Sequence, residues 1–79
     1  MRVKVLFFGA TADAVGSREI ELKTEENTAA SSLANDLTRQ YPLLSGHKLL
    51  IAVNEEYAGD DTTLSEGDEV AVFTAVSGG

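Results

Sequence analysis

The sequence predicts an α+β fold, in which a mixed sheet of four to five strands packs on one main helix. Segments near both ends of the chain alternate apolar and polar residues with the period of a strand. One central segment instead repeats its apolar residues every three or four positions, as a helix does. The chain has 79 residues, 43% of them hydrophobic, which is enough for one domain with one modest core.

The first strand is expected in residues 2–8 (RVKVLFF), where β-branched and aromatic residues dominate. Val3, Val5 and Phe7 fall on one face of this strand. The other face also carries apolar side chains, so we expect both faces to be partly covered.

A second strand is expected in residues 17–23 (SREIELK), where two apolar residues alternate with charged ones. This alternation predicts one buried and one solvated face. Gly9 and Gly16 interrupt the chain before this strand and bracket residues 10–15 (ATADAV), a length that fits one short helical turn.

The main helix is expected after the polar TEEN segment, with Asn27 or Thr28 as its N-cap and Pro42 at its end. Its apolar stripe consists of Ala30, Leu33, Ala34, Leu37 and Tyr41. Because the sequence predicts no further layer of helices or strands, this apolar stripe must pack against a single sheet.

Two strands and a connection follow the helix. Residues 48–54 (KLLIAVN) read as a buried strand, and residues 55–63 as a connection with at most a short edge strand. A Glu-Gly-Asp turn at 66–68 precedes the last strand, EVAVFTAV. Two hairpin-like pairs therefore flank one helix. This is a β-grasp arrangement over residues 1–75, followed by a flexible Gly-Gly tail at 76–79.

Composition argues against several classes of function. A net charge of −7 disfavours nucleic acid and anionic membranes as partners, because both attract basic surfaces. The absence of cysteine excludes thiolate metal sites, and His47 lies in a polar loop with no acidic residue at helical spacing, so we expect no metal site. The apolar run near the N-terminus is too short for a signal peptide or a membrane span, so we expect a cytoplasmic protein.

Acidic residues are concentrated in the last third of the chain, where seven Asp and Glu residues follow Lys48 and no Lys or Arg does. One interpretation is a solvated surface that keeps a small protein soluble. The other is an acidic collar beside the C-terminus that steers the tail toward a basic partner.

An exposed aromatic patch is expected on the sheet. If the valines of the last strand face the helix, Phe73 points outward. It can then share a surface with Tyr57 and with Leu6 or Phe8, and such a cluster would form a docking patch for a partner protein. A single exposed aromatic residue would need no such explanation.

The tail Val76-Ser77-Gly78-Gly79 carries the one unusual chemical group, the terminal carboxylate of Gly79. Four extended residues span about 13 Å, and glycines without Cβ atoms can thread a narrow channel in a partner. A carboxylate is a poor electrophile, so a partner would have to activate it, most simply by adenylation with ATP. Reaction with a persulfide would then give a thiocarboxylate. The alternative is a frayed chain end without function.

Three segments together resemble the small subunit of molybdopterin synthase, a ubiquitin-like sulfur carrier: VKVLFFGATADAVG, AVNEEY and LSEGDEVAVFTAVSGG. The resemblance covers essentially the whole chain. It implies that an activating enzyme adenylates Gly79, which becomes a thiocarboxylate and enters the large synthase subunit. Catalysis would belong to a complex of two small and two large subunits, and this chain would bind no cofactor itself. Phe73 and Tyr57 match apolar contact positions, and Gly78 and Gly79 match the tail.

Three alternatives remain beside this interpretation. The ending AVSGG also resembles thiamine-pathway sulfur carriers. A ubiquitin-like modifier would be joined to target lysines through Gly79. A plain interaction module would keep its activity without Gly78 and Gly79.

Overall fold

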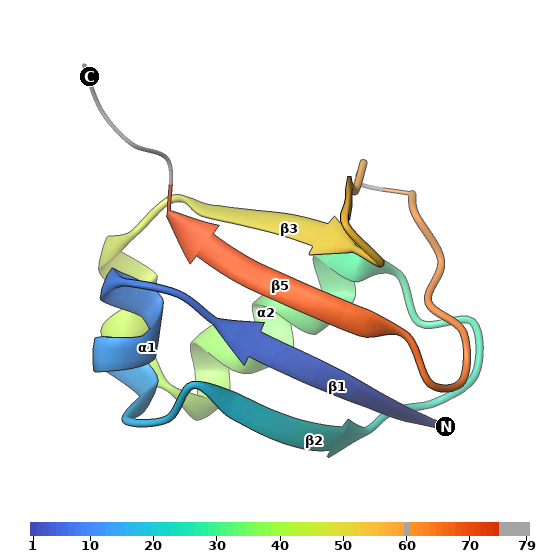
Figure 1. Cartoon of the computed structure of the whole chain (residues 1–79), viewed down its shortest axis with the longest axis horizontal. Coiled ribbons are helices and arrows are strands. Elements are labelled where there is room, and N and C mark those ends of the chain that lie inside the picture. Colours follow the sequence, from blue (N-terminus) through green and yellow to red (C-terminus); the bar gives the residue numbers. More distant parts are fainter. Residues whose placement is uncertain (60, 75–79) are drawn as a thin grey trace.

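The computed structural model describes residues 1–59 and 61–74, and within them a five-stranded sheet lies against the main helix α2 (Figure 1). The elements in chain order are β1 (Arg2–Phe7), α1 (Ala10–Val15), β2 (Glu19–Lys23), α2 (Ala30–Gln40), η1 (Pro42–Gly46), β3 (Leu49–Val53), β4 (Glu56–Tyr57) and β5 (Glu69–Thr74). The four predicted tail residues, Val76 to Gly79, and the domain boundary at residue 75 lie outside the described residues.

The sheet is mixed, with the strand order β2-β1-β5-β3-β4. The central strands β1 and β5 run parallel, whereas β2 is antiparallel to β1, and β3 is antiparallel to both β5 and β4. One antiparallel pairing therefore lies on one side of the parallel contact and two lie on the other. This confirms the predicted α+β class and the β-grasp arrangement.

The core lies between α2 and one face of the sheet. Leu33 and Leu37 of α2 are buried there, as the spacing of the apolar stripe predicts. From the sheet side, Val70 and Val72 are fully buried, which confirms that the valines of the last strand face the helix. The other buried core members are Val3, Val5, Phe7, Leu44 and Leu64. Burying each such side chain contributes about 1.5–3 kcal/mol.

The start of α2 differs from the sequence-based expectation. Neither Asn27 nor Thr28 is its N-cap: the helix begins after Ala29, and no side chain caps it. The backbone N–H of Ala30 instead donates to the carbonyl oxygen of Thr62 at 2.8 Å. A carbonyl from the connection between β4 and β5 thus supplies the acceptor that a capping side chain would provide.

The hairpin between β3 and β4 turns tightly through two residues with positive φ, Asn54 (51°) and Glu55 (71°). They connect Val53 and Glu56, which are register partners, and both residues having φ > 0 identifies a type I′ turn. β4 is two residues long, in agreement with the predicted short edge strand. Within residues 1–59 and 61–74, no helix has the length and apolar character needed to cross a membrane.

Candidate functional site

The face of the sheet opposite α2 carries an apolar row that crosses four strands. Strand register places Leu6 beside Ala71 and Ala71 beside Ala52, and Ala52 in turn lies beside Tyr57. Alternation along β5 puts Phe73 on the same face as Ala71, next to β3. This row adjoins the end of β5 at Thr74.

Two of the three predicted contact residues form an aromatic pair on this face. The ring centroids of Tyr57 and Phe73 lie 5.9 Å apart, with 55° between the ring planes. Tyr57 is 78% exposed and Phe73 is half-buried. Because aromatic side chains supply large contact areas with few rotatable bonds, this pair is suited to binding an apolar surface.

The third predicted contact residue, Phe8, shares a groove with Phe73. One wall is formed by Phe8, Gly9 and Ala10, and the other by Ala71, Phe73 and Thr74, with a volume of about 480 Å³. Phe8 is 53% exposed. We call these six residues the Phe8–Phe73 groove. The structure thus brings together all three residues that the sequence singled out, and their role in binding a partner stays a prediction.

The backbone of the Phe8–Phe73 groove is held by a residue that the sequence analysis did not single out. Thr11 of α1 is fully buried, and its hydroxyl lies 2.8 Å from the carbonyl oxygen of Val72 and within 3.0 Å of both backbone polar groups of Phe8. No local pattern marks this residue, because Val72 is 61 positions away in the sequence.

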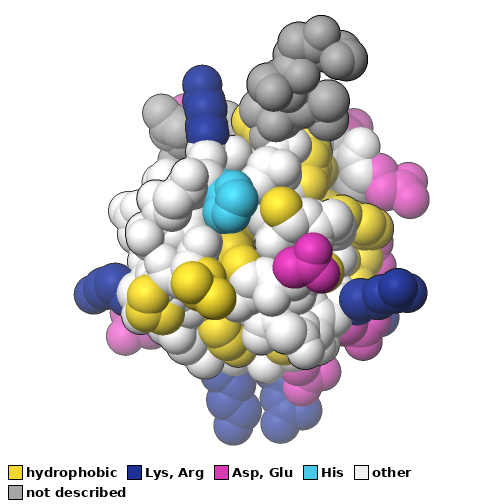
Figure 2. All heavy atoms as spheres, turned by 90° about the vertical axis from the view of Figure 1, so that its left-hand side faces the viewer, with side chains coloured by type: hydrophobic (Ala, Val, Ile, Leu, Met, Phe, Trp, Pro, Cys, Tyr) yellow, Lys and Arg dark blue, Asp and Glu magenta, His cyan; other side chains and the backbone are white. Residues whose placement is uncertain are grey.

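Figure 2 looks onto the end of the molecule that holds α1 and the end of β5. Hydrophobic side chains (yellow) stand in separate groups on this face, and one acidic side chain (magenta) lies near its middle. The Lys and Arg side chains (dark blue) and the other acidic ones lie towards its margins.

Three acidic residues from the last third of the chain stand away from Thr74, the last described residue. Glu55 follows the end of β3, and Asp68 and Glu69 stand at the start of β5. The start of β5 pairs with the end of β3, whereas Thr74 pairs with Leu49 at the opposite end. The acidic residues at the start of β5 therefore lie one strand length from Thr74.

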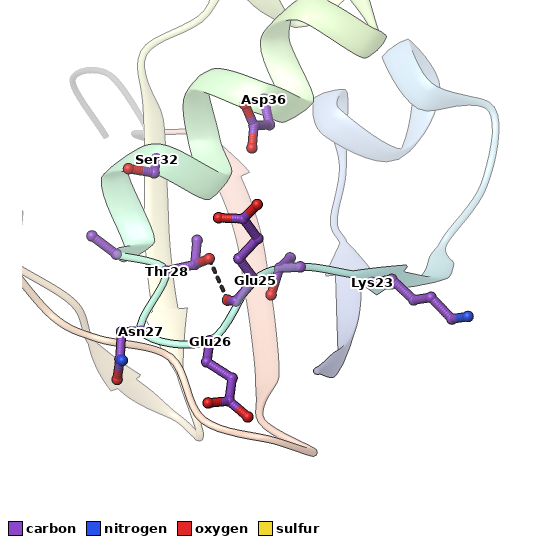
Figure 3. Close-up of a pocket in the computed structure, with 9 residues that line it drawn as sticks. Lys23, Glu25, Glu26, Asn27, Thr28, Ser32 and Asp36 are labelled. Carbon is purple, nitrogen blue, oxygen red and sulfur yellow. Dashed lines mark hydrogen bonds between the residues drawn. The ribbon is translucent and has the colours of Figure 1, made fainter.

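A second cavity, of about 550 Å³, lies between the end of β2 and the start of α2 (Figure 3). Its acidic side chains are Glu25, Glu26 and Asp36, and the carboxylates of Glu25 and Glu26 point in different directions. The hydroxyl of Thr28 donates to the backbone carbonyl of Glu25 at 2.6 Å, which fixes the loop. Across residues 1–59 and 61–74, no three His, Asp or Glu side chains are grouped so that they could hold a metal ion. We therefore assign no chemistry to this cavity.

Comparison with known proteins agrees with the fold. The model of the ThiS family matches residues 5–79. The molybdopterin synthase sulfur carrier subunit of Mycobacterium tuberculosis is 37% identical, over 100% of this chain and 99% of that protein.

Two solved structures are also similar to this chain over nearly its whole length. A Pyrococcus furiosus protein described as molybdopterin converting factor, subunit 1, superposes with a TM-score of 0.89 at 26% identity, covering 96% of this chain and 99% of that one. Small archaeal modifier protein 1 of Methanosarcina acetivorans has a TM-score of 0.79 at 26% identity, covering 99% and 96%. The chain belongs to the ThiS family, and the resemblance to molybdopterin synthase sulfur carrier subunits extends over its whole length.

Proposed function

We propose that this chain is the sulfur carrier of molybdopterin synthase and serves molybdenum cofactor biosynthesis. The observation that carries the proposal is the similarity to the M. tuberculosis sulfur carrier subunit, which spans all of this chain and nearly all of that protein. The aromatic pair and the Phe8–Phe73 groove support it, because a carrier must dock on the enzymes that load and unload it.

The reactive group in this proposal is the carboxylate of Gly79. It attacks the α-phosphate of ATP on an activating enzyme, which gives an acyl adenylate and releases pyrophosphate. A persulfide then displaces AMP and forms an acyl disulfide. A thiol reduces this bond, leaving sulfur on the carrier as a thiocarboxylate. Transfer of that sulfur to the pterin precursor, with hydrolysis of the acyl–sulfur bond, regenerates the carboxylate.

Two partners follow from this chemistry. The adenylating enzyme loads the carrier, and the large subunit of the synthase receives the sulfur. Both would contact the Phe8–Phe73 groove and Tyr57, while Val76, Ser77 and Gly78 carry Gly79 into the active site. This chain binds no cofactor in the proposal, since ATP belongs to the activating enzyme. We place these steps in the cytoplasm, as the sequence predicts.

Reconstitution of molybdopterin synthesis tests the proposal. The purified chain is combined with the large subunit, the activating enzyme, ATP, a sulfur donor and the cyclic pyranopterin precursor, and molybdopterin is measured. We expect product with the full chain and none after deletion of Gly78 and Gly79. A Ser77→Ala variant, which keeps the length of the tail, is the matched control and should remain active. Equal product from the deleted chain would contradict the proposal.

A second candidate function is conjugation to proteins, favoured by the structural similarity to a small archaeal modifier protein. In that case, lysates should contain branched Gly-Gly adducts on lysine side chains of target proteins. A sulfur carrier used only for thiamine synthesis would instead support formation of the thiazole and leave molybdopterin synthesis without sulfur.

A further inference from the structure

We propose that Thr11 is a positioning residue, whose buried hydroxyl holds the two walls of the Phe8–Phe73 groove in the arrangement that a partner binds. This inference rests on the proposed function in one respect, because it takes the large synthase subunit as the partner. The side chain of Thr11 is fully buried, so it acts through the residues of the groove and not by touching the partner.

The hydroxyl of Thr11 joins two segments that are distant in the sequence. Its oxygen accepts a hydrogen bond from the backbone N–H of Phe8 at 3.0 Å. Its single proton is donated to the carbonyl oxygen of Val72 at 2.8 Å or to that of Phe8 at 2.9 Å. One buried group therefore connects Phe8, the residue after β1, with Val72, which lies two residues before the end of β5.

This connection stands at the point where the parallel ladder between β1 and β5 stops. The last register pair of that ladder is Phe7 with Val72. Beyond it the chain turns at Gly9, whose φ is 58°, and enters α1. The N–H of Phe8 still reaches the carbonyl oxygen of Val72, but at 3.3 Å, a longer separation than that of the Thr11 bond.

Both aromatic residues of the groove are next to this connection. Phe8 provides the bonded N–H itself, and Phe73 directly follows Val72. Removing the hydroxyl while keeping the shape of the side chain would leave the buried carbonyl of Val72 with only the longer bond. A buried acceptor that loses its partner destabilises its local arrangement, so the two walls would move relative to each other.

The first experiment measures the free chain by amide hydrogen exchange. The variant Thr11→Val keeps the shape and loses the hydroxyl, whereas Thr11→Ser keeps the hydroxyl. Thr38→Val is the matched control, because the Thr38 hydroxyl donates to the carbonyl oxygen of Ala34 at 3.0 Å within α2. We expect exchange at the Phe8 amide to rise about tenfold in Thr11→Val and to stay unchanged in the other two variants. Unchanged exchange in Thr11→Val would overturn the inference.

The second experiment measures affinity for the purified large subunit by titration calorimetry. We expect Thr11→Val to bind about tenfold more weakly and Thr11→Ser to bind like the wild type. Because Thr11 acts partly through Phe8, Thr11→Val should cause a smaller loss of affinity in a Phe8→Ala background than in the wild-type chain.

Fully additive losses, or an equal loss in Thr38→Val, would show a general effect on the fold and overturn the inference. Failure of the wild-type chain to bind the large subunit would contradict the proposed function. The exchange experiment on the free chain would then still decide whether Thr11 holds the groove.

Discussion

The rings of Tyr57 and Phe73 contact each other across the open face of the sheet, with 5.9 Å between their centroids. Tyr57 belongs to the two-residue edge strand β4 and Phe73 to the central strand β5, and β3 lies between those strands. The pair adds little to the core, which lies on the opposite face. In the proposed function this pair contacts a partner protein, and the first prediction tests that role.

Replacement of Phe73 by alanine should weaken binding of the large subunit more than it lowers stability. Phe73 is half-buried and packs on an exposed ring, so we expect the free energy of unfolding to fall by about 1 kcal/mol. Loss of an aromatic contact at the centre of an interface should cost about 2 kcal/mol of binding free energy, or roughly 30-fold in Kd. Denaturant titration and calorimetry measure the two quantities.

The matched control for Phe73 is Val70→Ala on the same strand. Val70 is fully buried on the core face, so this variant should lose about 2 kcal/mol of stability and bind nearly as the wild type does. A larger loss of stability in Phe73→Ala than in Val70→Ala would contradict the assignment of faces.

Replacement of Gly9 by alanine should strain the backbone beside Phe8. The φ of 58° and ψ of −125° at Gly9 lie in a region that is open almost only to glycine. Apart from Gly9 itself and its two neighbours in the chain, no atom lies within 4 Å of the position that a Cβ would occupy, so the cost comes from the backbone and not from a clash. We expect the free energy of unfolding to fall by about 1–3 kcal/mol. Gly46→Ala, at a glycine without positive φ and with equal space, is the control; equal losses in the two variants would refute this explanation.

Replacement of Glu55 by glycine should stabilise the protein. Glu55 has a φ of 71° in the type I′ turn between β3 and β4, a conformation that an L-residue with a Cβ adopts at a cost and glycine adopts freely. We expect a gain of about 0.5–1 kcal/mol in the free energy of unfolding, measured by denaturant titration. Glu55→Ala removes the same charge but keeps a Cβ, so it should show no such gain. A gain of the same size in Glu55→Ala would point to charge, and not to φ, as the cause.

The elements that depend on local pattern were predictable from the sequence. Alternation places Val70 and Val72 toward the helix and Phe73 away from it, because a strand has a strict period of two and one face is buried. Spacing of three and four places Leu33 and Leu37 on the buried side of α2 for the corresponding reason.

The features that the sequence did not predict depend on contacts between distant residues. The first N–H group of α2 is bonded to Thr62, 32 positions from Ala30, so local capping preferences pointed to the wrong residues. Asp68 and Glu69 are close in sequence to the end of the chain, but they stand at the start of β5, and the length of that strand separates them from Thr74. The contact of Thr11 with Val72 likewise exists only once β1 and β5 are paired.

Intact mass spectrometry of the carrier itself tests most directly whether Gly79 carries the sulfur. The chain is incubated with the activating enzyme, ATP and a sulfur donor, alongside a variant extended by one alanine after Gly79. We expect the mass of the wild-type chain to change by the replacement of one oxygen with one sulfur, and the mass of the extended chain to stay the same. An unchanged wild-type mass, or the same change in the extended chain, would contradict the account.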